Sequence, residues 1–160
     1  LPPWAGLPGL KAGCVGAVRR YPIEHNALGA LGERKQSAFF RGHGRVPAGV
    51  AHESRRAKHA KLLEPLTIEV TPAVLGLLAD VMKTVPVGHT KFIDLYNYKG
   101  TADPILVATA IVLSTEDLFA DTWVIVTQDK EVSAKAKEFS IDTMTTKELA
   151  DVIDAATAAP

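Results

Sequence analysis

The segment ADPILVATAIVLSTEDLF, residues 102–119, constrains the fold more than any other part of the chain. Apolar side chains occupy nearly every face of the helix it would form, and such a helix has to be covered by other elements all round. The next segment, DTWVIVTQD at 121–129, has Trp, Val, Ile and Val at its centre, which is typical of a strand buried on both faces. A buried helix that leads into a buried strand indicates an α/β fold with a mainly parallel sheet.

The segments around this pair continue the alternation of strands and helices. Residues 66–70 alternate apolar and polar side chains like a short strand, and Thr71 and Pro72 then form a typical helix start. The remaining expected elements are a helix at 130–139, a strand at 140–144 and a closing helix whose capping box pairs Thr145 with Glu148. This order predicts a three-layer α/β sandwich with a mainly parallel central sheet.

Helical composition dominates the earlier part of the chain. PIEHNALGALGERKQSAFF at 22–40 predicts a helix with proline in its first turn, and VPAGVAHESRRAKHAKLLE at 46–64 predicts another. RGHGR at 41–45 is expected to be the turn between them. Residues 1–20, rich in Gly, Pro and Ala, are expected to be an irregular tail or a degenerate first strand, and residues 21–156 to form a single domain.

The net charge of zero conceals two oppositely charged halves. Residues 1–65 carry eleven Lys and Arg against four Glu, whereas residues 66–160 carry seven Lys against fourteen Asp and Glu. A basic half suits a polyanion and an acidic half suits a metal ion, although two unrelated solvated surfaces would give the same balance.

No stretch approaches the ~18–20 apolar residues that a membrane span needs. The single cysteine, Cys14, cannot form an internal disulfide, which favours a reducing cytoplasm.

Two aspartates are placed to meet at one edge of the expected sheet. Asp103 begins the buried helix, and Asp129 follows the Val-Ile-Val core of the central strand by three residues. Ligands of parallel α/β sheets bind at the carboxyl ends of the strands, where both acids are expected. Aspartate is also a favoured helix N-cap, so each acid has a second interpretation as a purely structural residue.

Five stretches share the pattern of one protein family. GTADPILVATAIVL at 100–113 is a buried helix that begins with aspartate, and WVIVTQDKEVSAKAKEFSI at 123–141 is a core strand that ends in a Thr-x-Asp turn. IDTMTTKEL at 141–149 follows as the closing strand and helix, while VPAGVAHES at 46–54 and RRYPIEHNALGALGERKQS at 19–37 match more loosely. In these features the chain resembles the PIN domain, a family of metal-dependent ribonucleases that includes many bacterial toxins of toxin–antitoxin pairs.

The resemblance implies an endoribonuclease that hydrolyses RNA phosphodiesters with Mg²⁺ or Mn²⁺. The implied catalytic and metal-binding residues are Glu53, Asp103 and Asp129. Carboxylate oxygens are the ligands that these hard cations prefer, and like charges held together also raise the pKa of one acid until the metal binds.

Further roles follow from the same resemblance. Thr127 is expected to orient a ligand or the phosphate, and Arg55 and Arg56 to attract the RNA backbone with the other basic residues of 41–61. The implied partners are RNA, a small antitoxin protein and a second copy of the chain in a homodimer, all in the cytoplasm. From the residues alone, Glu53 has an alternative role as a surface ion-pair partner of the neighbouring arginines.

One acid of the family pattern is missing from its expected place. PIN domains open with a strand that carries an aspartate, followed closely by Asn or Ser. The matching residues, 11–15, read KAGCV, and no aspartate occurs before Asp80. The loss of one of four carboxylates would weaken a metal site, so the alternative function is a catalytically inactive PIN-like α/β binding module. A further alternative is an unrelated α/β domain in which the acids only cap helices.

Overall fold

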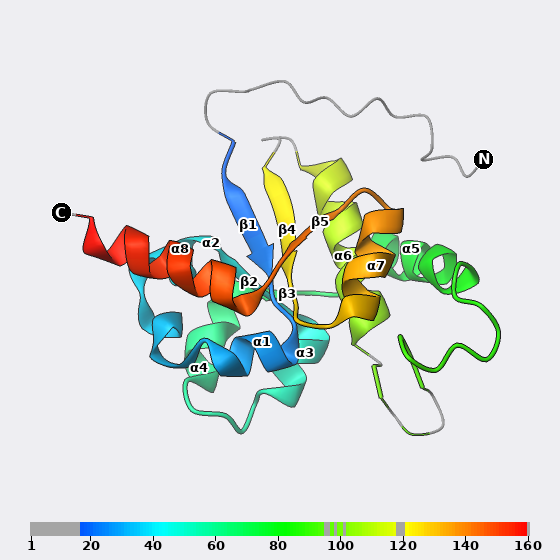
Figure 1. Cartoon of the computed structure of the whole chain (residues 1–160), viewed down its shortest axis with the longest axis horizontal. Helices are drawn as coiled ribbons and strands as arrows, with labels where there is room; N and C mark the ends of the chain where they lie inside the picture. Colours follow the sequence, from blue (N-terminus) through cyan, green and yellow to red (C-terminus); the bar gives the residue numbers. More distant parts are fainter. Residues whose placement is uncertain (1–16, 95–96, 98, 101, 118–120, 160) are drawn as a thin grey trace.

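The computed structural model is a five-stranded parallel sheet with helices on both faces (Figure 1), and it describes residues 17–94, 97, 99–100, 102–117 and 121–159. The strands lie in the order β3-β2-β1-β4-β5, and every neighbouring pair is parallel. They are β1 (Arg19–Pro22), β2 (Gly44–Pro47), β3 (Thr67–Ile68), β4 (Thr122–Val126) and β5 (Asp142–Met144). The helices are α1 (His25–Ala30), η1 (Gly32–Gln36), α2 (Ala38–His43), α3 (Ala48–Glu53), α4 (Ala60–Leu63), η2 (Glu64–Leu66), α5 (Pro72–Lys83), α6 (Asp103–Glu116), α7 (Lys130–Glu138) and α8 (Thr146–Ala158). The predicted three-layer α/β sandwich is confirmed.

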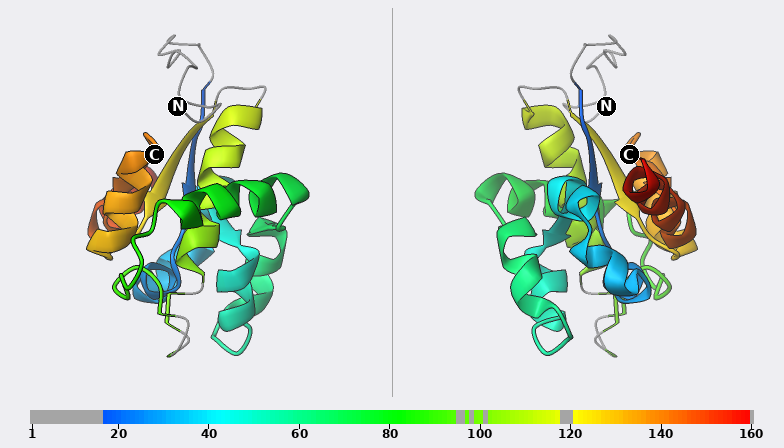
Figure 2. Two further views of the ribbon diagram at one scale, coloured as in Figure 1. Left: turned by 90° about the vertical axis from the view of Figure 1, so that its right-hand side faces the viewer. Right: turned by 90° about the vertical axis from the view of Figure 1, so that its left-hand side faces the viewer.

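Strand β4 supplies apolar side chains to both faces of the sheet. Val124 and Val126 belong to the core that includes residues of α1, α2 and α8, whereas Ile125 belongs to the core that includes residues of α5, α6 and α7. Successive side chains of a strand point to opposite faces, which explains this division. Figure 2 shows α6 and α8 on opposite sides of the central strands, so β4 is buried on both faces, as the sequence predicts.

Helix α6 is buried along most of its length. Eight of its residues, from Pro104 to Val112, are buried, and the helix packs against α5, α7 and β4. It connects the parallel strands β3 and β4 together with α5, and therefore runs back against the strand direction. Its first residue, Asp103, consequently lies at the carboxyl edge of the sheet, where β1 and β4 end.

Two of the helix starts predicted in the second half, those at Thr71 and Thr145, are confirmed in detail. The Thr71 hydroxyl accepts a hydrogen bond from the Val74 amide at 3.3 Å at the start of α5. Thr145 and Glu148 form the expected capping box of α8, in which each side chain accepts a backbone N–H of the other residue. Such caps satisfy backbone donors that a helix leaves free, which is why they mark its start in a sequence.

The first half differs from its predicted structure. Residues 19–22 form the central strand β1, and the single helix predicted at 22–40 is divided into α1, η1 and α2. The turn predicted at 41–45 instead holds the end of α2 and the start of β2. The helix predicted at 46–64 begins as the end of β2 and is interrupted between α3 and α4, where His59 adopts a φ of 73°.

Pairing within the sheet explains these differences. β1 lies between β2 and β4, and Tyr21 and Val46 are only 3% and 0% exposed. Strands of four residues carry little local signal, so burial against long-range neighbours overrides the helical composition of the segment.

The predicted place of the first strand, residues 11–15, lies outside the described residues. The first strand that the structure describes is β1, and Ile23 extends its pairing to Val126 of β4. The chain then reaches Glu24 at the carboxyl edge. Within the described part of the chain, no helix is both long and apolar enough to cross a membrane.

Candidate active site

Acidic side chains from four separate segments line one pocket at the carboxyl edge of the sheet. Glu24 follows β1, Glu53 ends α3, Asp103 begins α6 and Asp129 follows β4. The pocket has a volume of about 350 Å³. Residues of α1, α3 and the first turn of α6 line it, and Figure 1 shows these elements below the ends of β1 and β4. The structure therefore brings together the three acids singled out in the sequence and adds Glu24 to them.

Asp103 lies at the start of α6 without capping the helix. The N-cap residue is Ala102, and no side chain caps this end, so the interpretation of Asp103 as an N-cap is wrong. Burial raises the pKa of the Asp103 carboxyl to about 7, and the nearby carboxylates of Glu24, Asp129 and Glu53 contribute to the rise. A helix N-terminus favours a negative charge, so burial and the neighbouring acids outweigh the helix dipole here.

Gly100 allows the preceding loop to pass close to Asp103. Its φ is +70°, a region that only glycine adopts readily. A Cβ atom at this position would lie 2.3 Å from the Phe92 carbonyl oxygen and 3.1 Å from Oδ2 of Asp103. The close approach thus requires glycine, and it confines the Asp103 carboxylate on the loop side.

Glu24 is the functional candidate that the sequence reasoning missed. It is 8% exposed, and its backbone N–H donates to the Val126 carbonyl oxygen at 3.0 Å, which fixes it beside the end of β4. The Asn26 side-chain amide lies 3.4 Å from Oε1 of Glu24. The signal in the sequence was an acid directly after the alternating Tyr21 and Ile23, but this stretch was predicted to be a helix.

Thr127 links the acid after β1 to the acid after β4. Its hydroxyl donates to Oε2 of Glu24 and accepts from the Asp129 backbone N–H at 2.9 Å. Because Thr127 is only 2% exposed, it acts on the carboxylate of Glu24 and on the backbone of Asp129. A side chain in this position fixes the orientation of pocket residues.

Asp129 combines two roles that the sequence left as alternatives. Its Oδ1 accepts the Glu131 backbone N–H at 2.7 Å and so caps α7. The same side chain lines the acidic pocket. The cap holds one carboxylate oxygen in place, and no hydrogen bond to the other oxygen is seen among the described residues.

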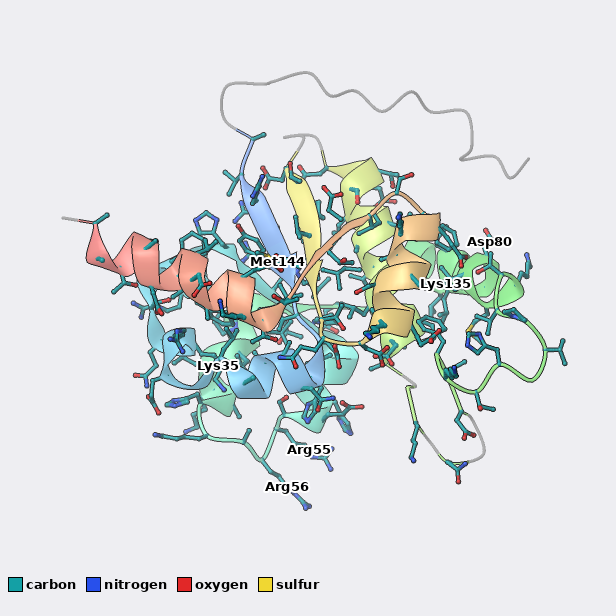
Figure 3. All side chains as sticks on the ribbon, in the orientation of Figure 1. Lys35, Arg55, Arg56, Asp80, Lys135 and Met144 are labelled. Carbon is teal, nitrogen blue, oxygen red and sulfur yellow. The ribbon has the colours of Figure 1, made fainter. Side chains whose placement is uncertain are left out.

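Glu53 faces a histidine instead of the arginines that follow it in sequence. Oε2 of Glu53 lies 3.6 Å from Nδ1 of His25, whose ring also lies 3.2 Å from the Ser54 hydroxyl. Arg55 and Arg56 line an adjoining hollow of about 200 Å³ that shares Glu53 with the main pocket. Figure 3 shows both arginine side chains pointing outward from the turn after α3. They lie beside the acidic pocket but outside it.

Two lysines enter the pocket from the opposite side. Lys91 and Lys99 belong to the loop between α5 and α6, where Asp94 and Lys99 exchange two backbone hydrogen bonds of 2.8 and 3.0 Å. Neither lysine forms an ion pair with any carboxylate of the described residues. The acidic pocket therefore has basic side chains on two sides, and this second group was not predicted.

The donor atoms of the pocket fit a hard divalent cation. Four carboxylates supply only oxygen, which Mg²⁺ and Mn²⁺ prefer. The pKa of Asp103 is raised mainly by burial and further by the neighbouring carboxylates, and a bound cation would offset both effects. Among the described residues, no three His, Cys, Asp or Glu side chains are already grouped as a ligand set. An arrangement of acids with flanking lysines and arginines is suited to a phosphate ester.

Compared with known proteins, the sequence matches no protein-family model and no curated protein.

Proposed function

We propose that this protein is a metal-dependent endoribonuclease of the PIN type. The observation that carries the proposal is the convergence of Glu24, Glu53, Asp103 and Asp129 from four segments on one pocket at the carboxyl edge of a parallel sheet. Parallel α/β sheets bind their ligands at this edge. Phosphodiester hydrolysis needs clustered oxygen ligands for Mg²⁺ or Mn²⁺, and this pocket has them.

The position of Glu24 supports the family resemblance. The acid expected in the first strand is absent at residues 11–15, but Glu24 follows the strand that occupies the centre of the sheet. Asn26 comes two residues later, and in the family pattern the aspartate is likewise followed closely by Asn or Ser. Glutamate is one methylene longer than aspartate, and this remains a departure from that pattern.

Each pocket residue has a separate task in the proposed reaction. Glu24, Asp103, Asp129 and Glu53 would hold the cation, which supplies an activated water and offsets charge on the phosphate. Thr127 keeps the Glu24 carboxylate oriented through its hydroxyl.

The basic residues act on the substrate backbone. Lys91 and Lys99 on one side, with Arg55 and Arg56 on the other, would hold the phosphates that flank the scissile bond. The RNA then crosses the acidic floor between the two basic groups. Holding the substrate in this way would bring the scissile phosphate close to the acids.

By the same resemblance, the proposed enzyme is the cytoplasmic toxin of a toxin–antitoxin pair. Its proposed protein partners are a small antitoxin and a second copy of the chain in a homodimer. A binding module without catalysis is the second candidate, because the carboxylate of Glu24 is already engaged by Thr127 and Asn26.

The test is cleavage of a 5′-labelled single-stranded RNA by the purified protein with Mn²⁺ or with EDTA. We expect cleavage only with Mn²⁺, and its loss in Glu24→Gln and in Asp103→Asn. Asp80→Asn is the matched control, because Asp80 is an exposed partner of Lys83 on α5 and does not line the pocket. Calorimetric titration separates the two candidates: Mn²⁺ binding that Asp103→Asn removes supports the enzyme, and no binding at millimolar Mn²⁺ supports the binding module.

A further inference from the structure

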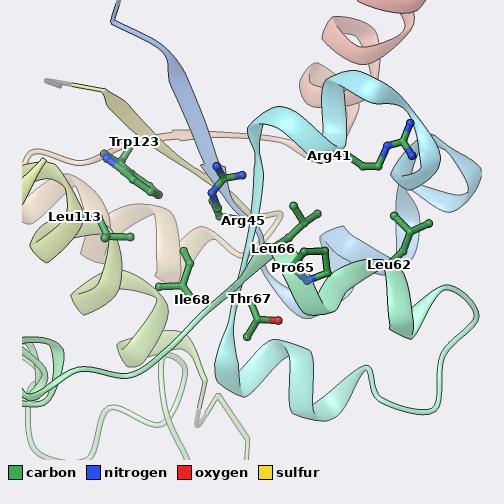
Figure 4. A pocket seen from close by; sticks show the side chains of 9 residues that line it. All are labelled: Arg41, Arg45, Leu62, Pro65, Leu66, Thr67, Ile68, Leu113 and Trp123. Atoms are coloured by element: carbon green, nitrogen blue, oxygen red, sulfur yellow. The ribbon is translucent and has the colours of Figure 1, made fainter.

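A second hollow lies away from the acidic pocket, and we call it the Trp123 trough. It has a volume of about 740 Å³ and shares no lining residue with the acidic pocket. Its lining residues are Arg41, Arg45, Leu62, Pro65, Leu66, Thr67, Ile68, Leu113 and Trp123 (Figure 4). They come from α2, β2, the α4–η2 turn, β3, the last turns of α6 and the start of β4.

The floor of the trough is apolar and partly exposed. Leu113, Ile68 and Trp123 are half-buried, and Figure 4 shows them grouped at one end of the hollow. The indole N–H of Trp123 donates to the Asp117 carboxylate at 3.2 Å, which fixes the ring in this position. A concave site lined by apolar side chains with a few polar groups at its rim is typical of a binding site for another molecule.

The charged side chains that line the trough are both arginines, and the Asp117 carboxylate bonded to Trp123 is not a lining residue. Arg41 and Arg45 form no ion pair with a carboxylate among the described residues. Arg45 instead donates to the carbonyl oxygens of Gly42 and Gly44, and burial lowers the pKa of its guanidinium. Excess positive charge beside an apolar floor favours an occupant that is both apolar and acidic.

The edge of the sheet adds a constraint on the shape of that occupant. Among the strands that the structure describes, β3 is outermost, and both of its residues, Thr67 and Ile68, line the trough. An outermost strand has one side without a partner strand, and extended peptides bind beside such strands. The aliphatic side chains of Leu62, Leu66 and Leu113 favour a peptide over RNA, because RNA has no hydrocarbon side chains to bury against them.

We propose that the Trp123 trough binds an extended protein segment that carries both apolar and acidic side chains. The apolar side chains contact Ile68, Leu113 and Trp123, and the carboxylates pair with Arg41 and Arg45. This proposal does not depend on the ribonuclease proposal, since the two sites share no residue.

The test is binding of a fluorescein-labelled octapeptide, Ser-Leu-Glu-Leu-Glu-Leu-Glu-Ser, measured by fluorescence anisotropy on the full chain. We expect saturable binding that Arg41→Glu weakens by about 10-fold or more, as for a close interfacial charge pair. Lys137→Glu is the matched control: Arg41 and Lys137 are both basic residues in the last turn of a helix, and Lys137 does not line the trough. We expect it to leave the affinity nearly unchanged.

Tryptophan fluorescence locates the bound peptide. The chain has two tryptophans, so Trp4→Phe leaves Trp123 as the only reporter. The unlabelled peptide should shift its emission to shorter wavelength as the ring loses water. The proposal is overturned by an absence of saturable binding, by equal affinity for the same peptide with Gln in place of Glu, or by equal effects of Arg41→Glu and Lys137→Glu. A single-stranded RNA that shifts the Trp123 emission while the peptide does not would also overturn it.

Discussion

Asp103 is placed where its charge is unfavourable, and this predicts a stabilising substitution. Its pKa of about 7 in the folded protein lies above the ordinary value of 3.8, so folding favours the protonated acid. Stability from this group is therefore present at low pH and is lost as the pH rises towards 7. At pH 8 without metal, we expect Asp103→Asn to raise the free energy of unfolding by about 1–2 kcal/mol, a figure reduced for partial exposure.

Urea unfolding of both proteins in EDTA, at pH 8 and at pH 5, measures this effect. The increase in the free energy of unfolding caused by Asp103→Asn should be largest at pH 8. It should shrink at pH 5, where the Asp103 carboxyl of the folded protein is protonated. Asp80→Asn, at an exposed site, should differ from the native protein by less than about 0.5 kcal/mol at both pH values. Equal stability of Asp103→Asn and the native protein at pH 8 would contradict the cost of a buried charge among neighbouring carboxylates that is inferred for Asp103.

The Thr127 hydroxyl is a second residue whose role can be isolated. Thr127→Val removes the donor to Glu24 and the acceptor for the Asp129 N–H, which leaves two polar groups unsatisfied. We expect a loss of about 1–3 kcal/mol in stability and a weakening of Mn²⁺ binding by about 10- to 100-fold. Thr127→Ser keeps the hydroxyl and should retain most of the Mn²⁺ affinity measured by calorimetry. Equal affinities of the Val and Ser variants would rule out the orienting role.

The acids of the pocket were predictable from the sequence to different degrees. Asp103 and Asp129 were found because each adjoins a long, strongly apolar element whose ends are visible in the sequence. Glu24 was missed because it follows a strand of four residues, and the segment that contains Glu24 was predicted to be a helix. An acid can be assigned to the carboxyl edge of a sheet only when the segment before it is known to be a strand. The orientation of Glu24 by Thr127 depends on two residues 103 positions apart, and no local pattern encodes such a pair.

The helices and strands also differ in how far the local sequence predicts them. α5 and α8 have side-chain caps and apolar stripes, so their local sequence alone predicts them. β1 and β2 are short, end in proline and are held by partners on both sides, so their structure comes from the assembled sheet. Sequence periodicity is informative only over segments longer than these.

The loop between α5 and α6 contains a position where glycine is required. In Gly100→Ala, the new Cβ would lie 2.3 Å from the Phe92 carbonyl oxygen, at a φ that alanine rarely adopts. We expect a loss of about 2 kcal/mol in thermal or urea unfolding and weaker Mn²⁺ binding, because Asp103 is displaced.

Gly76 provides the control for this prediction. It lies exposed inside α5, and an added Cβ there would have no atom within 4 Å. Gly76→Ala should therefore stabilise the protein by about 0.5–1 kcal/mol, since alanine favours a helix. A Gly100→Ala protein as stable as the native one would show that the loop adapts without moving Asp103.

At the scale of the whole molecule, the fold mixes the two charged halves of the sequence. The acidic pocket takes Glu24 and Glu53 from the basic half, and Asp103 and Asp129 from the acidic half. Its flanking lysines, at 91 and 99, come from the acidic half. The asymmetry along the chain is therefore not carried over to the pocket, which combines charged side chains of both halves.

This local field predicts how RNA binding depends on salt. If Lys91 and Lys99 each contact one phosphate of a single strand, each Lys→Gln substitution should weaken binding and reduce the slope of log K against log salt by about 0.7. The double variant should lose about twice as much slope, because the contacts release counterions independently.

Lys137→Gln removes the same charge from the last turn of α7, outside the pocket, and should leave the slope unchanged. The measurement is fluorescence anisotropy of a labelled 12-nucleotide poly(U) in EDTA between 50 and 200 mM KCl, where binding proceeds without cleavage. Slopes that fall equally in all three single variants would assign the effect to net charge instead of to contacts at the pocket.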